Sequence, residues 1–275
     1  MFQFIANIFG YLLEWLYNGI GQNYGIALIL FTIILRIILL PLTIKQQKSM
    51  KKTTELQGKM QEIQFKYKNN PELMNKEIMD LYKRENLSPF SGCISSIVQI
   101  LIILSVFYLV SRPLTYMKKI DPGIIENYRN EISAENDGKI SNYYEIEIIQ
   151  KKAVQDENIK VNMDFLGLDL SKVPSQNMTD IEVYIIPILY VISSIFSIRM
   201  TTGKTKKKEQ NGSSEPDMTQ QMNKSMSYMM PIMAVSIAFV APLGLALYWL
   251  ISNILMILER IVINKYVDSK EEKTL

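Results

Sequence analysis

The sequence contains no histidine and one cysteine, Cys93. Without histidine there is no imidazole general base and no histidine-ligated metal site. A single cysteine excludes CxxC redox pairs and an intrachain disulfide. HExxH and GxSxG motifs and paired intramembrane aspartates are also missing, and Gly203-Lys204-Thr205 does not end a P-loop because residue 198 is Ile. We therefore expect a protein that is not an enzyme and that uses no cofactor or metal.

Strong net charge is lacking as well. The chain of 275 residues carries a net charge of +3, with 48% hydrophobic and 21% charged residues. This balance is too mild to indicate a nucleic acid ligand. The amino terminus has no basic residues ahead of its apolar run and no A-x-A site, which argues against a cleaved signal peptide.

Long apolar runs are present, separated by charged stretches. About 20 apolar residues are needed for a helix to cross a bilayer. The fourth apolar run has only 14 residues and is short for a span. Either the bilayer is thinner beside it or the predicted boundaries of this span are imprecise. We predict an all-α integral membrane protein with five transmembrane helices, at residues 24–43, 91–111, 181–200, 228–241 and 243–263.

The connections differ in charge, which predicts their orientation. Residues 45–86 have ten basic and six acidic side chains, whereas residues 114–182 have eight basic and thirteen acidic. Basic loops stay in the cytoplasm. We therefore place segments 44–90, 201–227 and 264–275 in the cytoplasm and segments 1–23 and 112–180 outside.

Four stretches outside the spans are also predicted to be helical. Phe4, Ile8, Tyr11, Leu12, Trp15 and Leu16 have helical spacing, which predicts an interfacial helix or one that packs on the bundle. The acidic stretches 122–135 and 143–155 also have helical patterns. The pattern of segment 44–90 predicts an antiparallel helical hairpin, and the alternative is a solvated amphipathic pair that serves only as a spacer. The repeating apolar side chains are Leu56, Met60, Ile63, Tyr67, Met74, Ile78 and Leu81.

Arg36 is the most informative residue of the first span. It lies roughly 13 Å inside the predicted cytoplasmic end, where an arginine costs about 2.5–3.5 kcal/mol in lipid. It either faces a polar cavity or extends toward the interface. We expect no acidic partner deep in a span, because Glu259 lies near the inner end of the last helix. An unpaired cation would attract a transient anionic partner.

Polar side chains on several spans could line such a cavity. Each is also common in interhelical packing, so no single one is decisive. The residues are Thr32, Ser95, Ser96, Gln99, Tyr190, Ser193, Ser194, Ser197, Trp249, Ser252 and Asn253.

Five ordered segments carry a family resemblance. The chain resembles the YidC-type membrane protein insertases of the Oxa/Alb superfamily, in a compact Gram-positive-like form without a large external domain. The segments are LRIILLPLTIKQQKS from Leu35, NLSPFSGCISSIVQ from Asn86, FLGLDLSK from Phe165, YMMPI from Tyr228 and PLGLALYWLISN from Pro242.

The resemblance implies a groove that is open to the cytoplasm and the lipid and closed outside. Arg36 matches the groove arginine of the family, and Gln99 and Trp249 match groove-lining positions. The hairpin of segment 44–90 matches the cytoplasmic hairpin that recruits substrate in the family. The implied function is insertion of newly made membrane proteins into a bacterial cell membrane, as an insertase and chaperone, with the Sec translocon and the ribosome as further candidate partners. The short mixed-charge tail differs from the long basic ribosome-binding tails of some members. The alternative is a small-anion channel or transporter that uses Arg36 for selectivity.

Overall fold

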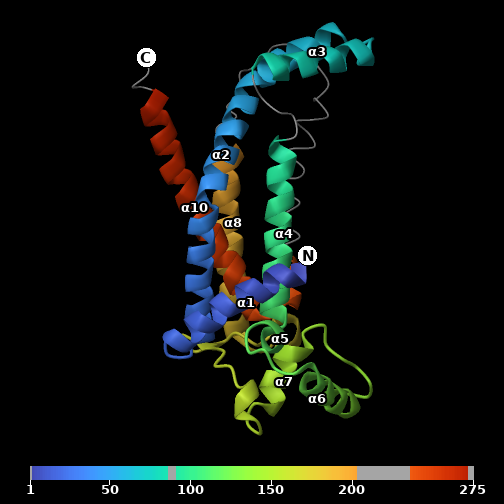
Figure 1. The fold of residues 1–275 in the computed structure, drawn as a ribbon, viewed down its shortest axis with the longest axis vertical. Coiled ribbons are helices and arrows are strands. Elements are labelled where there is room, and N and C mark those ends of the chain that lie inside the picture. Colours follow the sequence, from blue (N-terminus) through green and yellow to red (C-terminus); the bar gives the residue numbers. More distant parts are fainter. Residues whose placement is uncertain (1, 86–90, 203–235, 272–275) are drawn as a thin grey trace. The chain divides into compact units, whose positions relative to one another are not determined.

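The computed structural model describes residues 2–85, 91–202 and 236–271. They are mostly helical, and one short antiparallel hairpin is the only sheet among them. In chain order the elements are α1 (Phe2–Gly19), α2 (Tyr24–Lys66), α3 (Pro71–Arg84), α4 (Ser91–Ser111), α5 (Pro113–Tyr116), α6 (Pro122–Glu135), α7 (Tyr144–Lys152), η1 (Glu157–Ile159), β1 (Asp164–Phe165), β2 (Leu168–Asp169), η2 (Pro174–Gln176), η3 (Ile181–Tyr184), α8 (Ile185–Thr202) and α10 (Leu243–Glu271) (Figure 1).

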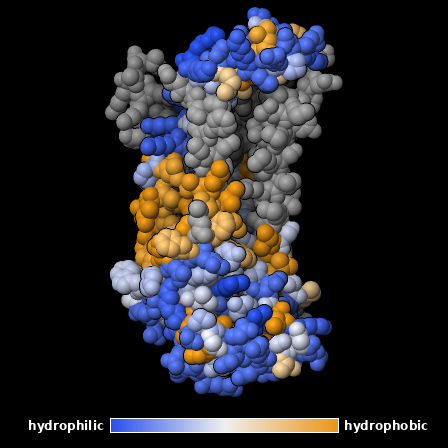
Figure 2. Space-filling model, turned by 45° about the vertical axis from the view of Figure 1, so that its right-hand side comes forward, coloured by the Kyte–Doolittle hydropathy of each residue, from blue (hydrophilic) through white to orange (hydrophobic). Residues whose placement is uncertain are grey.

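Among the described residues, three segments are long and apolar enough to span a membrane, namely Tyr24–Ser49, Ile181–Met200 and Leu243–Ile263. The last two have the bounds predicted from the sequence. Ile97–Ser111, in α4, is a shorter apolar helix. Only 28–33% of each long segment is buried within the protein. The remaining apolar surface is unfavourable in water and favourable in the lipid bilayer. Figure 2 shows apolar side chains in a belt beside a broad polar surface. The chain is an all-α membrane protein.

Two predicted segments fall mainly outside the described residues. These are the basic loop 201–227 and the fourth span, 228–241. Residues 236–240 are helical and lead through Pro242 into α10.

The described chain forms two compact units. The first contains residues 1–36 and 105–275, and the second contains residues 37–104. In the first unit α8 packs along α10, and the two helices lie side by side in Figure 1. This pairing joins two of the candidate spans.

Helices extend past the predicted ends of their spans. α2 continues from Tyr24 to Lys66, through Pro41 and the predicted boundary at Thr43. α10 likewise continues to Glu271, eight residues beyond the expected end at Ile263. The change in hydropathy marks where lipid ends, but a helix ends only where its backbone is interrupted.

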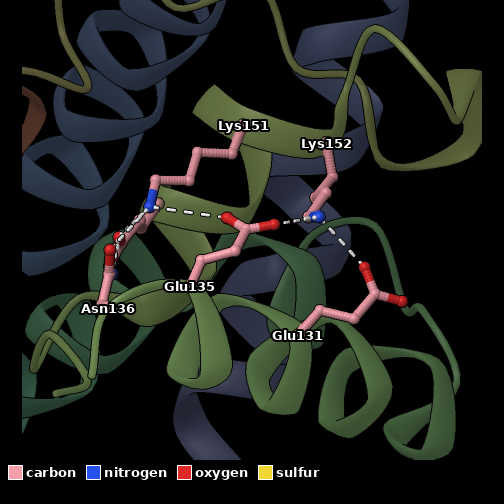
Figure 3. Close-up of polar contacts among 6 residues, drawn as sticks. Glu131, Glu135, Asn136, Lys151 and Lys152 are labelled. Atoms are coloured by element: carbon pink, nitrogen blue, oxygen red, sulfur yellow. Dashed lines mark hydrogen bonds and ion pairs between the residues drawn. The ribbon is translucent and has the colours of Figure 1, made fainter. Parts of the chain in front are cut away.

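The first unit also contains a folded polar segment between α4 and α8. α6 and α7 cover the two acidic stretches predicted to be helical, and Asp121 caps α6 by accepting a hydrogen bond from the Gly123 amide at 2.8 Å. Lys152 of α7 contacts Glu131 at 3.0 Å and Glu135 at 2.9 Å, both on α6 (Figure 3). These contacts join the two helices.

α1 packs against α5 through Gly10. A Cβ atom at Gly10 would lie 1.9 Å from the carbonyl oxygen of Tyr116, so only glycine permits this approach. The opposite face of α1 carries exposed apolar side chains, namely Phe4, Ile8, Tyr11 and Trp15. α1 therefore packs on the bundle with one face and leaves an aromatic face uncovered.

In the second unit α3 lies beside the last turns of α2 (Figure 1). Asn70 caps α3 through a hydrogen bond from the Leu73 amide, and Pro71 follows at the first helical position, as its fixed φ favours. Lys59 contacts Glu85 at 2.9 Å, and the Tyr82 hydroxyl lies 3.7 Å from the Met60 sulfur.

Candidate functional site

Arg36 of α2 is held by α10. One guanidinium nitrogen, Nη2, donates to the Ser252 carbonyl oxygen at 3.0 Å and to the Ser252 hydroxyl at 2.6 Å. The other, Nη1, lies 3.6 Å from Oε2 of Glu259. Both charged side chains are largely buried, with 14% and 12% of their surface exposed.

The expectation that Arg36 has no acidic partner is therefore wrong. Glu259 lies two helical turns after Ser252, on the same side of α10. The long guanidinium group can reach both residues. The sequence contained the carboxylate, but it did not show how far along α10 the Arg36 side chain would reach.

A second set of contacts joins α8 and α10 beside this pair. The Asn253 side-chain amide donates to the hydroxyls of Ser193 at 2.8 Å and Ser194 at 3.3 Å. Ser193 in turn donates to the Tyr190 carbonyl oxygen at 2.8 Å. These hydrogen bonds satisfy polar groups that would be costly in lipid. We call Arg36, Ser193, Ser194, Ser252, Asn253 and Glu259 the polar cluster.

Three other predicted residues also belong to the first unit. Thr32 is buried and donates to the Leu28 carbonyl oxygen at 2.7 Å, within its own helix. Trp249 is half-buried, with its ring 6.3 Å from that of Tyr190. Ser197 is half-buried on α8.

The remaining predicted residues belong to the second unit. Gln99 is half-buried in α4, while the side chains of Ser95 and Ser96 are outside the described residues. Leu56 and Leu81 are buried in this unit. The other apolar residues predicted for the hairpin are all half-buried, namely Met60, Ile63, Tyr67, Met74 and Ile78.

One segment, residues 162–172, accepts hydrogen bonds from first-turn amides of both α2 and α10. The first amide groups of a helix have no partner within it. In α10, Leu243 donates to the Lys172 carbonyl at 2.9 Å and Gly244 to the Leu170 carbonyl at 2.8 Å. In α2, the Tyr24 amide donates to the Asn162 carbonyl at 3.0 Å.

The same segment packs closely on the start of α2. A Cβ atom at Gly25 would lie 2.5 Å from the Phe165 ring, so this ring lies directly against the backbone. Both helices therefore begin at the folded polar segment, under a lid built from the β1–β2 hairpin and its flanks. The family-like sequence FLGLDLSK, from Phe165 to Lys172, makes up most of this lid.

The chain is similar to known proteins over most of its length. The model of the 60Kd inner membrane protein family matches residues 15–271. The membrane protein insertase YidC of Treponema denticola is 30% identical over 263 residues, which is 95% of this chain and 37% of that protein. The Oceanobacillus iheyensis protein of that name is 28% identical over 272 residues, covering 96% of this chain and 85% of its own length.

Coverage differs among these relatives. The YidC of Geobacter metallireducens is 29% identical over 92% of this chain, but the match covers only 35% of that protein. The chain thus spans little more than a third of the length of several relatives and most of the Oceanobacillus protein.

Proposed function

The chain belongs to the 60Kd inner membrane protein family, and from this premise we propose that it is an insertase that passes segments of newly made membrane proteins into the bilayer. The relatives compared above carry the name membrane protein insertase YidC. The proposal applies that activity to this chain. Nascent membrane proteins are its clients, and the Sec translocon and the ribosome remain candidate partners.

The observation that carries the proposal is the guanidinium group of Arg36 in the middle of an apolar helix. Its contacts come from Ser252 and Glu259 of a second candidate span. An arginine at such a depth costs about 2.5–3.5 kcal/mol unless polar groups surround it. The cluster therefore supports a membrane-embedded polar site, which we propose is the groove that receives the polar flank of a client.

Insertion by this route needs no nucleotide. Contact with the spans captures the apolar segment of the client, and partition of that segment into lipid supplies the free energy. Arg36 lowers the cost of drawing an acidic flank into the membrane. A membrane potential, positive outside, further favours outward movement of negative charge.

We further propose a direction for this movement. The basic connections place the hairpin of segment 44–90 in the cytoplasm, where it would recruit clients, and the acidic segment 112–180 outside. The lid over the starts of α2 and α10 supports a groove that is closed on the outer side. Two further spans, 91–111 and 228–241, complete a five-helix core in this proposal. No observation on the described residues favours a small-anion channel.

The test is insertion into liposomes containing the purified protein. The client has one span and an acidic tail, and its insertion is measured by protease protection. We expect Arg36→Ala to reduce insertion about tenfold, equivalent to about 1.4 kcal/mol, and Arg36→Lys to retain most of it. Arg199→Ala, which removes an exposed arginine at the end of α8, is the matched control and should insert normally.

Two results would contradict the proposal at different levels. Equal insertion with and without the wild-type protein would rule out insertase activity for this client. Equal insertion by wild type, Arg36→Ala and Arg36→Lys would be compatible with insertase activity but would rule out an electrostatic role for Arg36.

A further inference from the structure

Arg36 is held unequally by its two partners. Ser252 accepts two hydrogen bonds from Nη2, at 3.0 and 2.6 Å. Glu259 approaches Nη1 only to 3.6 Å, and within the described residues its buried Oε2 atom has no hydrogen-bond partner. Strong arginine–carboxylate pairs are bidentate, with distances of about 2.7–2.9 Å. The serine therefore fixes the guanidinium group, and the glutamate only balances its charge.

The position of Glu259 allows it to be replaced. It lies four residues before the end of the candidate span at Ile263. The span ends about 6 Å beyond Glu259 along the helix axis, so a displaced Glu259 carboxylate would be close to water. An incoming carboxylate would meet a guanidinium group already oriented by Ser252, with Nη1 facing a loosely held anion.

We propose that Glu259 is a resident counter-ion of Arg36 that a client carboxylate replaces, so that Glu259 determines how strongly the site prefers acidic flanks. This inference rests on the proposed insertase function. It assigns a specificity-determining role to a residue that the sequence pattern did not include in the site. In the empty site the pair is close to neutral, which lowers the cost of the buried arginine. Exchange of one carboxylate for another conserves that balance.

The exchange predicts a direction for selectivity. Glu259 competes with acidic flanks but not with neutral ones. Removing its charge while keeping its shape should therefore favour acidic clients over neutral clients. A purely structural ion pair would instead affect both clients alike.

The experiment uses the complete protein in liposomes with two matched clients, one with Asp in its flank and one with Asn at the same positions. The measured quantity is the ratio of acidic-client to neutral-client insertion at limiting client concentration. We expect Glu259→Gln to raise this ratio about two- to tenfold, the range for a partly screened ion pair. Glu259→Asp keeps the charge and should retain the wild-type ratio. The Arg36→Ala/Glu259→Gln double variant should show no rise over Arg36→Ala.

A further control is Glu157→Gln, which neutralises an exposed carboxylate in η1. It should leave the ratio unchanged. The inference is overturned if Glu259→Gln leaves the ratio unchanged or lowers it, or if Glu259→Asp changes the ratio as much as Glu259→Gln does. It is also overturned if Glu259→Gln fails to accumulate in membranes, because the ion pair would then be structural. Failure of the wild-type protein to insert either client would instead defeat the proposed function, and this inference with it.

Discussion

Glu145 is a buried carboxylate in the folded polar segment, outside the candidate spans. It accepts hydrogen bonds from the Thr115 amide at 2.9 Å and the Thr115 hydroxyl at 2.6 Å, which link α7 to α5. Burial raises the pKa of Glu145 above its ordinary value, while the hydrogen bonds from Thr115 and the charge of Arg112 oppose that rise.

This pKa shift predicts how the docking of α7 depends on pH. Because the pKa is higher in the folded state, the stability contributed by Glu145 is complete below its unfolded pKa of about 4.3. It is lost as pH rises through the folded pKa. Glu145→Gln retains an acceptor and a donor for Thr115 and should abolish this dependence. Hydrogen exchange of α5 and α7 amides in wild type and variant, from pH 4 to 7, measures the difference.

Comparison with the variant is necessary because other carboxyls oppose this trend. Hydrogen bonding to Lys152 lowers the pKa of Glu135, so its contribution is lost on acidification. Glu145→Ala supplies the complementary test. It leaves the Thr115 amide without its acceptor and should cost about 1–3 kcal/mol. Unchanged exchange in Glu145→Ala would show that this contact does not hold α7.

At single positions, the sequence predicted which residues are polar in the spans better than it predicted their partners. Arg36, Ser193, Ser252 and Asn253 are predicted to line a polar cavity, and the structure pairs Arg36 with Ser252 and Asn253 with Ser193 across three helices, α2, α8 and α10. The sequence places Glu259 near the inner end of its own helix but does not show how far it lies from Arg36 on another helix. The offset between α2 and α10 depends on packing, which a pattern within one helix does not contain.

Among the elements, α1 offers a test in which two similar substitutions have opposite effects. Gly10→Ala would place a methyl group against the backbone of Tyr116, which cannot rotate away. We expect the packing of α1 against α5 to be weakened by about 1–3 kcal/mol, the usual cost of adding a methyl group to a closely packed contact. Gly19→Ala, at the end of the same helix, meets nothing within 4 Å. It should instead stabilise the helix by up to about 1 kcal/mol.

Hydrogen exchange of amides 2–19 in nanodiscs measures both effects. Faster exchange in Gly10→Ala and equal or slower exchange in Gly19→Ala is the expected pair of results. If the two variants exchange alike, the close contact between α1 and α5 does not hold the helix. That outcome would leave the exposed Phe4, Ile8, Tyr11 and Trp15 face as the main attachment of α1.

The extent to which elements could be predicted depended on local signals. α6 begins where Asp121 and Pro122 indicate a helix start, and α3 begins after Asn70 in the same way. The caps of α10 could not be predicted, because its amides pair with carbonyls about 70 residues away. A sequence shows that such donors need acceptors, but it does not identify them.

For the whole molecule, the central prediction is its orientation in the membrane. Cys93 is the only cysteine, so Cys93→Ser gives a background without thiols. Val154→Cys introduces a thiol at a position that is 95% exposed in the folded polar segment, and Asn69→Cys introduces one in the exposed turn before α3. In intact cells, a membrane-impermeant maleimide should label Val154→Cys but not Asn69→Cys. Permeabilised cells should show labelling of both.

This measurement tests the step on which the mechanism depends. The polar cluster can draw an acidic flank outward only if the basic hairpin faces the cytoplasm and the lid lies outside. If only Asn69→Cys is labelled in intact cells, the chain has the opposite orientation. The lid would then lie on the side of the membrane from which clients arrive. The Arg36 experiment could not reveal such an inversion in liposomes of mixed orientation, because the correctly oriented fraction would still insert the client. Orientation must therefore be measured in cells, independently of activity.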